Sequence, residues 1–146
     1  MVTSAIIIFP QSESIETGLY LNLPHDSCSG QNKEHTIVFN ADTLCIESNP
    51  VINVNDIDSC ITENANLDGN NLYVLNIKLK KSASSKFKET TEQNVGKIMV
   101  MVIDNEAVMA AVIRDPVTSG RLSISGMKIQ KIDELKSKLQ KEMRSK

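Results

Sequence analysis

The sequence predicts an α+β fold, with a mostly antiparallel sheet and two main helices packed on one face. Three observations support this class. Two apolar runs, at residues 98–103 and 107–113, flank an acidic turn, as the strands of a hairpin do. Residues 72–79 alternate between apolar and polar side chains, the period of a strand with one buried face. Residues 83–95 and 129–143 repeat apolar side chains at about one helical turn, which predicts two helices.

The N-terminal part is predicted to be a tether followed by short strands. Residues 1–18 are interpreted as an N-terminal tether or a trimmed export segment, because their apolar run is short and lacks the basic flank of a signal peptide. Residues 19–146 are expected to form a single α+β domain. Within it, leucines alternate over 19–23 as in a strand, and residues 36–39 and 43–47 predict a hairpin.

The segment before residue 72 has the weakest pattern. Asn53 or Asn55 stands where it can cap a short helix that runs to Ile61. Residues 62–71 have no apolar period, so they are predicted to be an internal loop.

The two long helices have recognisable ends. Ser82 is the predicted N-cap of the first, and Gly96 stands where a glycine commonly ends a helix. The second helix follows a short strand at 122–124 and carries cations near its C-terminal end, where the helix dipole favours them. The apolar stripe of the first helix is predicted to be Ala83, Phe87, Thr91 and Val95.

Composition excludes several classes of protein. Aromatic residues make up 3% of the chain and tryptophan is absent, so the aromatic platforms that stack nucleic-acid bases are not expected. The net charge of −2 gives no overall attraction to phosphate, and no nucleic-acid partner is expected. No apolar segment has the length of a membrane span, so no direct span is predicted in this chain.

Charge is distributed unevenly along the chain. Residues 1–70 hold ten acidic residues and one lysine, a net charge of −9, whereas residues 71–146 hold 15 basic and eight acidic residues, a net charge of +7. Either the halves pack together and partly neutralise each other, or they form a two-faced surface for a charged partner. A cluster of lysines could meet an anionic surface, although lysines at such positions are commonly only solvated: Lys78, Lys80, Lys81, Lys86, Lys88 and Lys97.

Reactive side chains are few. The odd set Cys28, Cys45 and Cys60 leaves two alternatives: three small apolar side chains, or one disulfide with one free thiol in an oxidising compartment. The cluster His25-Asp26-Ser27-Cys28, with His35 nearby, lacks the second close pair of a zinc site and any signature of a cysteine nucleophile. No catalytic residue, metal ligand or cofactor is therefore assigned, and the chain is expected not to be an enzyme.

The hairpin and its surroundings carry a family resemblance. Asn94-Val95-Gly96-Lys97 is similar to a helix end of the form N-x-G-K/R, and the apolar strand ending at Asp104 is similar to one ending in D-G. Residues 108–113, 117–121 and 124–126 then follow the order of V-x-S-A-P-x-I, I-x-x-G and I-x-G. These motifs resemble the head part of the large periplasmic domain of SecD, the accessory subunit of the bacterial Sec protein-export machine.

The resemblance covers residues 45–140, and residues 1–44 match poorly. Asn105 replaces the family's turn glycine, which is tolerated because asparagine also accepts positive φ. Ala111 replaces the family's proline, so a less rigid return strand is expected. Eight positions carry the family motifs and are expected to be structural more than binding: Asn94, Gly96, Asp104, Asn105, Ile113, Gly120, Arg121 and Gly126.

The resemblance implies a non-enzymatic binding module in the periplasm or the membrane-associated cell envelope. Its partners would be unfolded or translocating polypeptide, held transiently, or Sec-type membrane components. The alternative is a structural or adaptor domain that docks on a membrane partner and holds no polypeptide. An open edge of an antiparallel sheet offers a mechanism for holding, because it adds an extended peptide through backbone hydrogen bonds that are blind to sequence.

Overall fold

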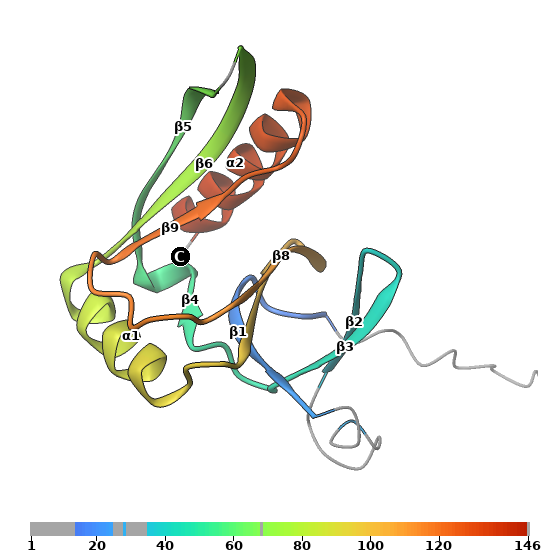
Figure 1. The fold of residues 1–146 in the computed structure, drawn as a ribbon, viewed down its shortest axis with the longest axis vertical. Helices are drawn as coiled ribbons and strands as arrows, with labels where there is room; N and C mark the ends of the chain where they lie inside the picture. Colours follow the sequence, from blue (N-terminus) through green and yellow to red (C-terminus); the bar gives the residue numbers. More distant parts are fainter. Residues whose placement is uncertain (1–13, 25–27, 29–34, 68, 146) are drawn as a thin grey trace, which may run out of the picture.

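The computed structural model describes residues 14–24, 28, 35–67 and 69–145. The predicted apolar run near the N-terminus and His25-Asp26-Ser27 of the histidine–cysteine cluster lie outside these residues. Two antiparallel sheets and two long helices make up the described part (Figure 1). The predicted α+β class with a mostly antiparallel sheet is therefore confirmed.

The larger sheet has six strands and curls until its end strands, β2 and β8, lie against each other. Across the sheet the order is β2, β3, β1, β7 and β8, with β4 paired to β1, and every pairing is antiparallel. The bounds are β1 Gly18–Leu23, β2 His35–Phe39, β3 Asp42–Ile46, β4 Ile52–Asn53, β7 Ile98–Ile103 and β8 Glu106–Val112.

The smaller sheet has three strands in the order β5, β6 and β9. They are β5 Ile57–Leu67, β6 Asn70–Leu79 and β9 Arg121–Ile124. Leu75, Ile77 and Leu79 of β6 are buried, whereas Lys78 between them is exposed. The alternation predicted for residues 72–79 is therefore present.

The predictions for residues 53–71 were right about the cap at Asn53 and wrong about the length of the helix and about the loop. A 3₁₀ turn, η2 Val54–Asp56, with Asn53 as its cap, replaces the expected short helix, and β5 fills most of the expected loop. A register shift lies between Ile57 and Ser59, and beyond Ile61 the strand carries mostly polar residues, so it lacks the alternating apolar pattern that reveals a strand. Pairing with the strongly patterned β6 holds this polar segment extended, because strand propensity depends on the neighbouring strand.

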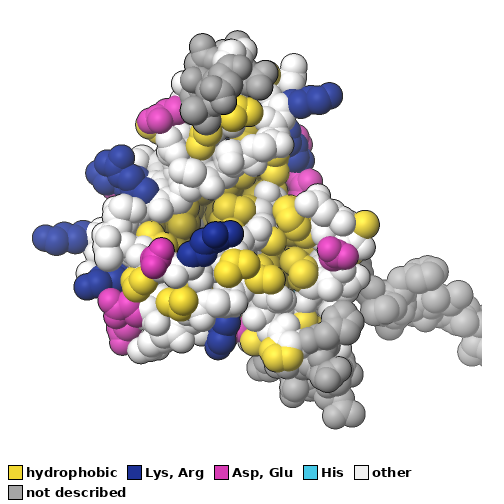
Figure 2. Space-filling view, in the orientation of Figure 1, with side chains coloured by type: hydrophobic (Ala, Val, Ile, Leu, Met, Phe, Trp, Pro, Cys, Tyr) yellow, Lys and Arg dark blue, Asp and Glu magenta, His cyan; other side chains and the backbone are white. Residues whose placement is uncertain are grey.

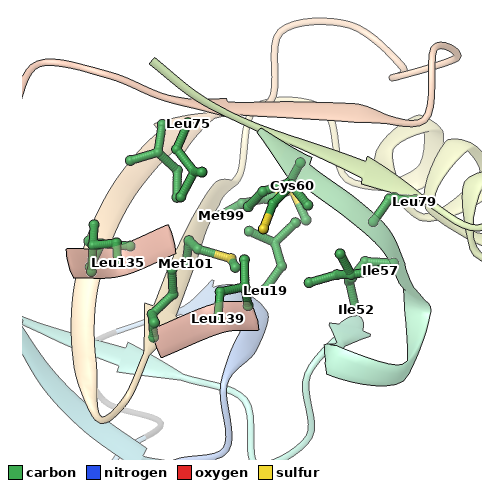
Figure 3. Packing of buried hydrophobic residues seen from close by; sticks show 14 of the residues in the cluster. Leu19, Ile52, Ile57, Cys60, Leu75, Leu79, Met99, Met101, Leu135 and Leu139 are labelled. Carbon is green, nitrogen blue, oxygen red and sulfur yellow. The ribbon is translucent and has the colours of Figure 1, made fainter. Parts of the chain in front are cut away.

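Two hydrophobic cores lie on opposite sides of β7. Met99, Met101 and Ile103 face the large core, which lies between the two sheets (Figure 3). Val100 and Val102 face the small core inside the curled sheet. A strand covered on both faces needs apolar residues at every position, which explains its continuous apolar run. The large core also takes side chains from β1, β5, β6 and both helices.

Two-residue turns close both hairpins of the curled sheet. Asn40 and Ala41 have φ of 49° and 69°, and Asp104 and Asn105 have φ of 51° and 63°. Positive φ at both central residues gives a turn whose twist matches that of the flanking strands. The predicted turns are therefore in place, and Asn105 adopts the conformation expected of a residue that replaces glycine.

Helix α1, Lys81–Gln93, buries three of the four predicted stripe residues: Ala83, Phe87 and Thr91. Val95 lies beyond the helix and is 52% exposed. The predicted cap at Ser82 was wrong, because Lys80 takes that position without a side-chain hydrogen bond. A single residue separates β6 from α1, so the end of the strand sets the start of the helix.

Helix α2, Ile129–Arg144, lies across one face of the smaller sheet and buries Ile132, Leu135 and Leu139. Helix α1 instead continues beyond the end of β6 (Figure 1). The expectation that both helices pack on one face is therefore not confirmed. Within the described ranges, neither α1 nor α2 has the length and apolar content of a membrane span.

Candidate functional site

The structure joins Cys28 and Cys45 in a disulfide and leaves Cys60 as a free thiol in the large core. Burial raises the pKa of the Cys60 thiol, and the nearby Lys136 lowers it by less. The thiolate is the nucleophilic form, so this environment opposes a reactive cysteine. No three histidine, cysteine, aspartate or glutamate side chains are grouped to hold a metal within the part of the chain that the structure describes.

Three of the family-motif positions join the end of α1 to the start of β7. Asn94 caps the helix, and its side-chain amide donates to the Thr90 carbonyl over 2.7 Å. The Gly96 amide donates to the Ile113 carbonyl over 2.8 Å, and Gly96 has a φ of 93°, which favours glycine. Ile113 is buried, and its amide donates to the Lys97 carbonyl over 2.8 Å.

Asp104 and Asn105 form the β7–β8 turn and fasten it to the segment before β1. The Ile15 amide donates to Asn105 Oδ1 over 2.6 Å, and the Asp104 amide donates to Thr17 Oγ1 over 3.1 Å. The Asp104 carboxylate lies 3.3 Å from Lys138 Nζ of α2. The turn therefore contacts both the start of the curled sheet and the helix of the smaller sheet.

Gly120, Arg121 and Gly126 lie around β9. The Gly120 carbonyl accepts from the Leu79 amide over 2.8 Å, and a Cβ at this glycine would lie 2.5 Å from Ser84 Oγ. Gly126 has a φ of 85°. Arg121 is exposed on β9 and is paired in register with Lys78. A binding role for any of the eight motif positions stays a prediction.

The edge of β5 is the longest open strand edge in the described part of the chain. This 11-residue strand pairs with β6 on one side and with no described strand on the other. The opposite edge of the smaller sheet is the four-residue β9, and the end strands of the curled sheet lie against each other. An unpaired strand exposes a row of backbone donors and acceptors that can pair with another extended chain.

The face of the smaller sheet that points away from α2 carries polar rows beside this edge. Ser59, Lys78 and Arg121 form one row, because Ser59 pairs with Lys78 and Lys78 with Arg121. Ile61, Asn76 and Ser123 form the next, in which Ser123 Oγ donates to Asn76 Oδ1 over 2.6 Å. The rows surround a hollow of about 120 Å³ that Glu63 also lines.

A second apolar region lies between the sheets. Figure 2 shows hydrophobic side chains gathered across the middle of one face, between the smaller sheet and β8. The half-buried residues that pack against the large core include Tyr73, Met109, Val117 and Leu122. This region is the margin of the core, whereas the β5 edge is backbone with which no described strand pairs.

The sequence pattern predicts a short helix and a loop over the residues of β5, so it points to no functional residue there. The signal that could have found the strand is the dipeptide Asp68-Gly69 in the sequence before the strong pattern of β6, because such a dipeptide often precedes the second strand of a hairpin. Gly69 does have positive φ, at 79°.

Two solved structures share this arrangement of sheets and helices. One, from work on the structure and function of a membrane component SecDF that enhances protein export, has a TM-score of 0.60 and 18% identity, over 85% of this chain and 62% of its own. The other, SecDF in its super-membrane-facing form, has a TM-score of 0.57 and 21% identity, over 80% of this chain and 14% of its own. The fold is thus that of an α+β region found in SecDF.

The sequence comparison is more specific. A sequence model of the SecDF P1 head subdomain matches residues 31–142, so the chain belongs to this family. The match begins upstream of residue 45, and it therefore includes the β2–β3 hairpin, which the motif comparison had left out.

Protein translocase subunit SecD of three bacteria matches shorter parts of the chain. The Thermobaculum terrenum protein is 41% identical over 37% of this chain, that of Rickettsia bellii 36% over 47%, and that of Aquifex aeolicus 37% over 56%. These matches cover 10%, 13% and 15% of the respective relatives, so the chain corresponds to a small part of each.

Proposed function

We propose that this chain is a binding module of protein export that holds extended polypeptide transiently along β5. The observation that carries the proposal is the 11-residue open edge of that strand. Family membership supplies the context, because the solved SecDF structure comes from a membrane component described as enhancing protein export. The proposed role is binding and involves no catalytic step.

Backbone pairing suits a holder of many different chains. A strand added to an antiparallel sheet is bound through main-chain groups that every residue except proline carries in full. Side chains next to the edge then adjust the affinity. Ile61 is 52% exposed and Leu72 40% exposed, so contacts there are apolar but shallow. The described residues of this face include no aromatic anchor, so the complex would be weak, as release of the held chain requires.

We further propose that the domain works outside the cytoplasm, in the periplasm or at the cell envelope. The Cys28–Cys45 disulfide supports this location, because disulfides persist in oxidising compartments. The membership in a family named for the SecDF P1 head supports it independently.

The test is binding of a fluorescent, permanently unfolded export substrate to the purified chain, with a folded protein as control. Short extended peptides are compared with versions that carry N-methyl groups on alternate amides. N-methylation removes the donors that a sheet edge needs and leaves the side chains unchanged. We expect saturable binding of the unfolded substrate and the plain peptide, and loss of binding after methylation.

A matched pair of variants locates the site. Ile61→Ala removes an exposed side chain from β5, and Val95→Ala removes an equally exposed one beyond α1, since each is 52% exposed. The first should weaken binding and the second should not. Saturable binding that changes neither with methylation of the peptide nor with Ile61→Ala would show that the β5 edge is not the binding site. Absence of binding, together with a stable complex with a folded membrane partner, would favour the adaptor role.

A further inference from the structure

We propose that the segment held along β5 places an acidic side chain beside Ser59 and an apolar side chain beside Ile61. This inference rests on the proposed function and adds to it the chemistry of the preferred polypeptide. It is carried by the row of Ser59, Lys78 and Arg121 and by the exposed Ile61 in the next row.

The reach of Lys78 is sufficient for the contact. A strand added to β5 would lie about 10 Å from β6, because neighbouring strands are about 4.8 Å apart. Ser59 stands between them and has a short side chain, so a lysine and a glutamate can meet above it. Arg121, one strand further on, adds positive potential to the same row.

Lys78 and Arg121 of this row form no ion pair among the described residues. The same holds for Lys80 and Lys81 within the part of the chain that the structure describes. Asp58 shares a neighbouring hollow with the three lysines, which leaves a surplus of positive charge there.

Glu63 lies four residues from Ser59 along β5. That is about 13 Å in a strand, beyond the screening length of about 8 Å at physiological ionic strength. The attraction of an acidic side chain beside Ser59 to the cations of its own row would therefore be stronger than its repulsion from Glu63. At the position between them, Ile61 offers an apolar contact that favours an apolar neighbour.

The test uses three peptides of about nine residues, short enough to fit the edge of β5. The three peptides share a neutral sequence that alternates apolar and polar residues around a central valine. They differ only at the position two residues from this valine, which is glutamate, glutamine or lysine. We expect the glutamate peptide to bind about three- to fivefold more tightly than the glutamine peptide, the effect of an exposed ion pair, and the lysine peptide to bind most weakly. About 1 M salt should remove the differences.

Two variants test whether Lys78 causes the difference in affinity between the peptides. Lys78→Gln should make the glutamate and glutamine peptides bind equally, whereas Lys97→Gln, which removes an exposed lysine beyond α1, should leave their ratio unchanged. Equal binding of all three peptides to the unmodified chain, with loss on N-methylation, would overturn this inference and leave the proposed function in place. Failure of every peptide to bind would overturn the proposed function as well.

Discussion

The backbone amide of Val117 donates a hydrogen bond to Thr91 Oγ1 over 2.8 Å, and the same hydroxyl donates to the Phe87 carbonyl over 2.9 Å. Thr91 is fully buried in the last turn of α1, and Val117 lies in the segment between β8 and β9. One hydroxyl therefore fixes the path of the segment that leads from the curled sheet to the smaller sheet.

Replacing Thr91 by valine should lower the free energy of unfolding by about 1–2 kcal/mol. The substitution keeps the shape of the side chain but leaves the half-buried Val117 amide without this acceptor. Urea denaturation measures the change. Thr90→Val, one residue earlier and only half-buried, is the control and should have a smaller effect. Equal effects of the two variants would show that helix propensity, not the hydrogen bond, is responsible.

Gly120→Ala should destabilise the protein more than Gly126→Ala. Both glycines have positive φ, at 67° and 85°, so each alanine carries a backbone cost of about 1–2 kcal/mol. At Gly120 the new Cβ would also lie 2.5 Å from Ser84 Oγ, while at Gly126 nothing lies within 4 Å. Thermal unfolding compares the two variants. Adding Ser84→Gly to Gly120→Ala should remove the part of its destabilisation that exceeds that of Gly126→Ala. If the added change recovers no stability, the steric explanation is contradicted.

Loss of the Cys28–Cys45 disulfide should lower stability by about 3 kcal/mol. The bond closes a loop with a sequence separation of 17, and the chain-entropy model assigns about this value to such a loop. Denaturation with and without a reductant measures it, with the Cys28→Ala, Cys45→Ala double variant as the insensitive control. Counting thiols in the denatured, unreduced protein should give one, from Cys60. Three thiols would show that the disulfide is absent in the protein tested.

Tyr20 should make stability fall at alkaline pH. Its burial, with a smaller contribution from the Glu16 carboxylate, raises the pKa of its hydroxyl from 10.0 to about 12. The folded state thus holds this proton more tightly than the unfolded state does. The contribution to stability, about 2–3 kcal/mol, is fully present below pH 10 and is lost as the pH rises through 12.

Tyr20→Phe should remove this part of the pH dependence, which unfolding at several alkaline pH values measures. The lysines of α2 also contribute in this range, because carboxylate partners raise the pKa of Lys131 and Lys138. The comparison with the phenylalanine variant isolates the tyrosine. In the folded protein, the ultraviolet absorbance of tyrosinate should rise in steps with pH, and the step at the highest pH should be absent from the variant. An unchanged titration would contradict the assignment to Tyr20.

The parts of the fold with strong local patterns could be predicted from the sequence. The β7–β8 hairpin was predictable because β7 is buried on both faces and its turn residues accept positive φ. Helix α2 was predictable from its single apolar stripe. The position of α1 was not predictable, because an apolar stripe indicates that a helix is buried but does not indicate the element against which it packs.

The candidate site was the part that the sequence concealed. Strand β5 is polar, contains a register shift after Ile57, and is extended because β6 pairs with it. Its open edge is a property of the arrangement of strands, which no local pattern encodes. The pairing of Cys28 with Cys45 was likewise left open, since spacing alone does not choose among three cysteines.

The pairing of β1 with β7 has a consequence for how the chain is made. Leu19 pairs with Met101, so the curled sheet cannot be completed until both of these distant segments have been synthesised. The β5–β6 hairpin pairs neighbours in the chain and can form earlier, but α2, which covers its buried face, is synthesised later still. Contacts between such distant segments slow folding. During that interval the apolar face of the hairpin and its outer edge are both uncovered, and an incomplete chain with such surfaces is prone to aggregate.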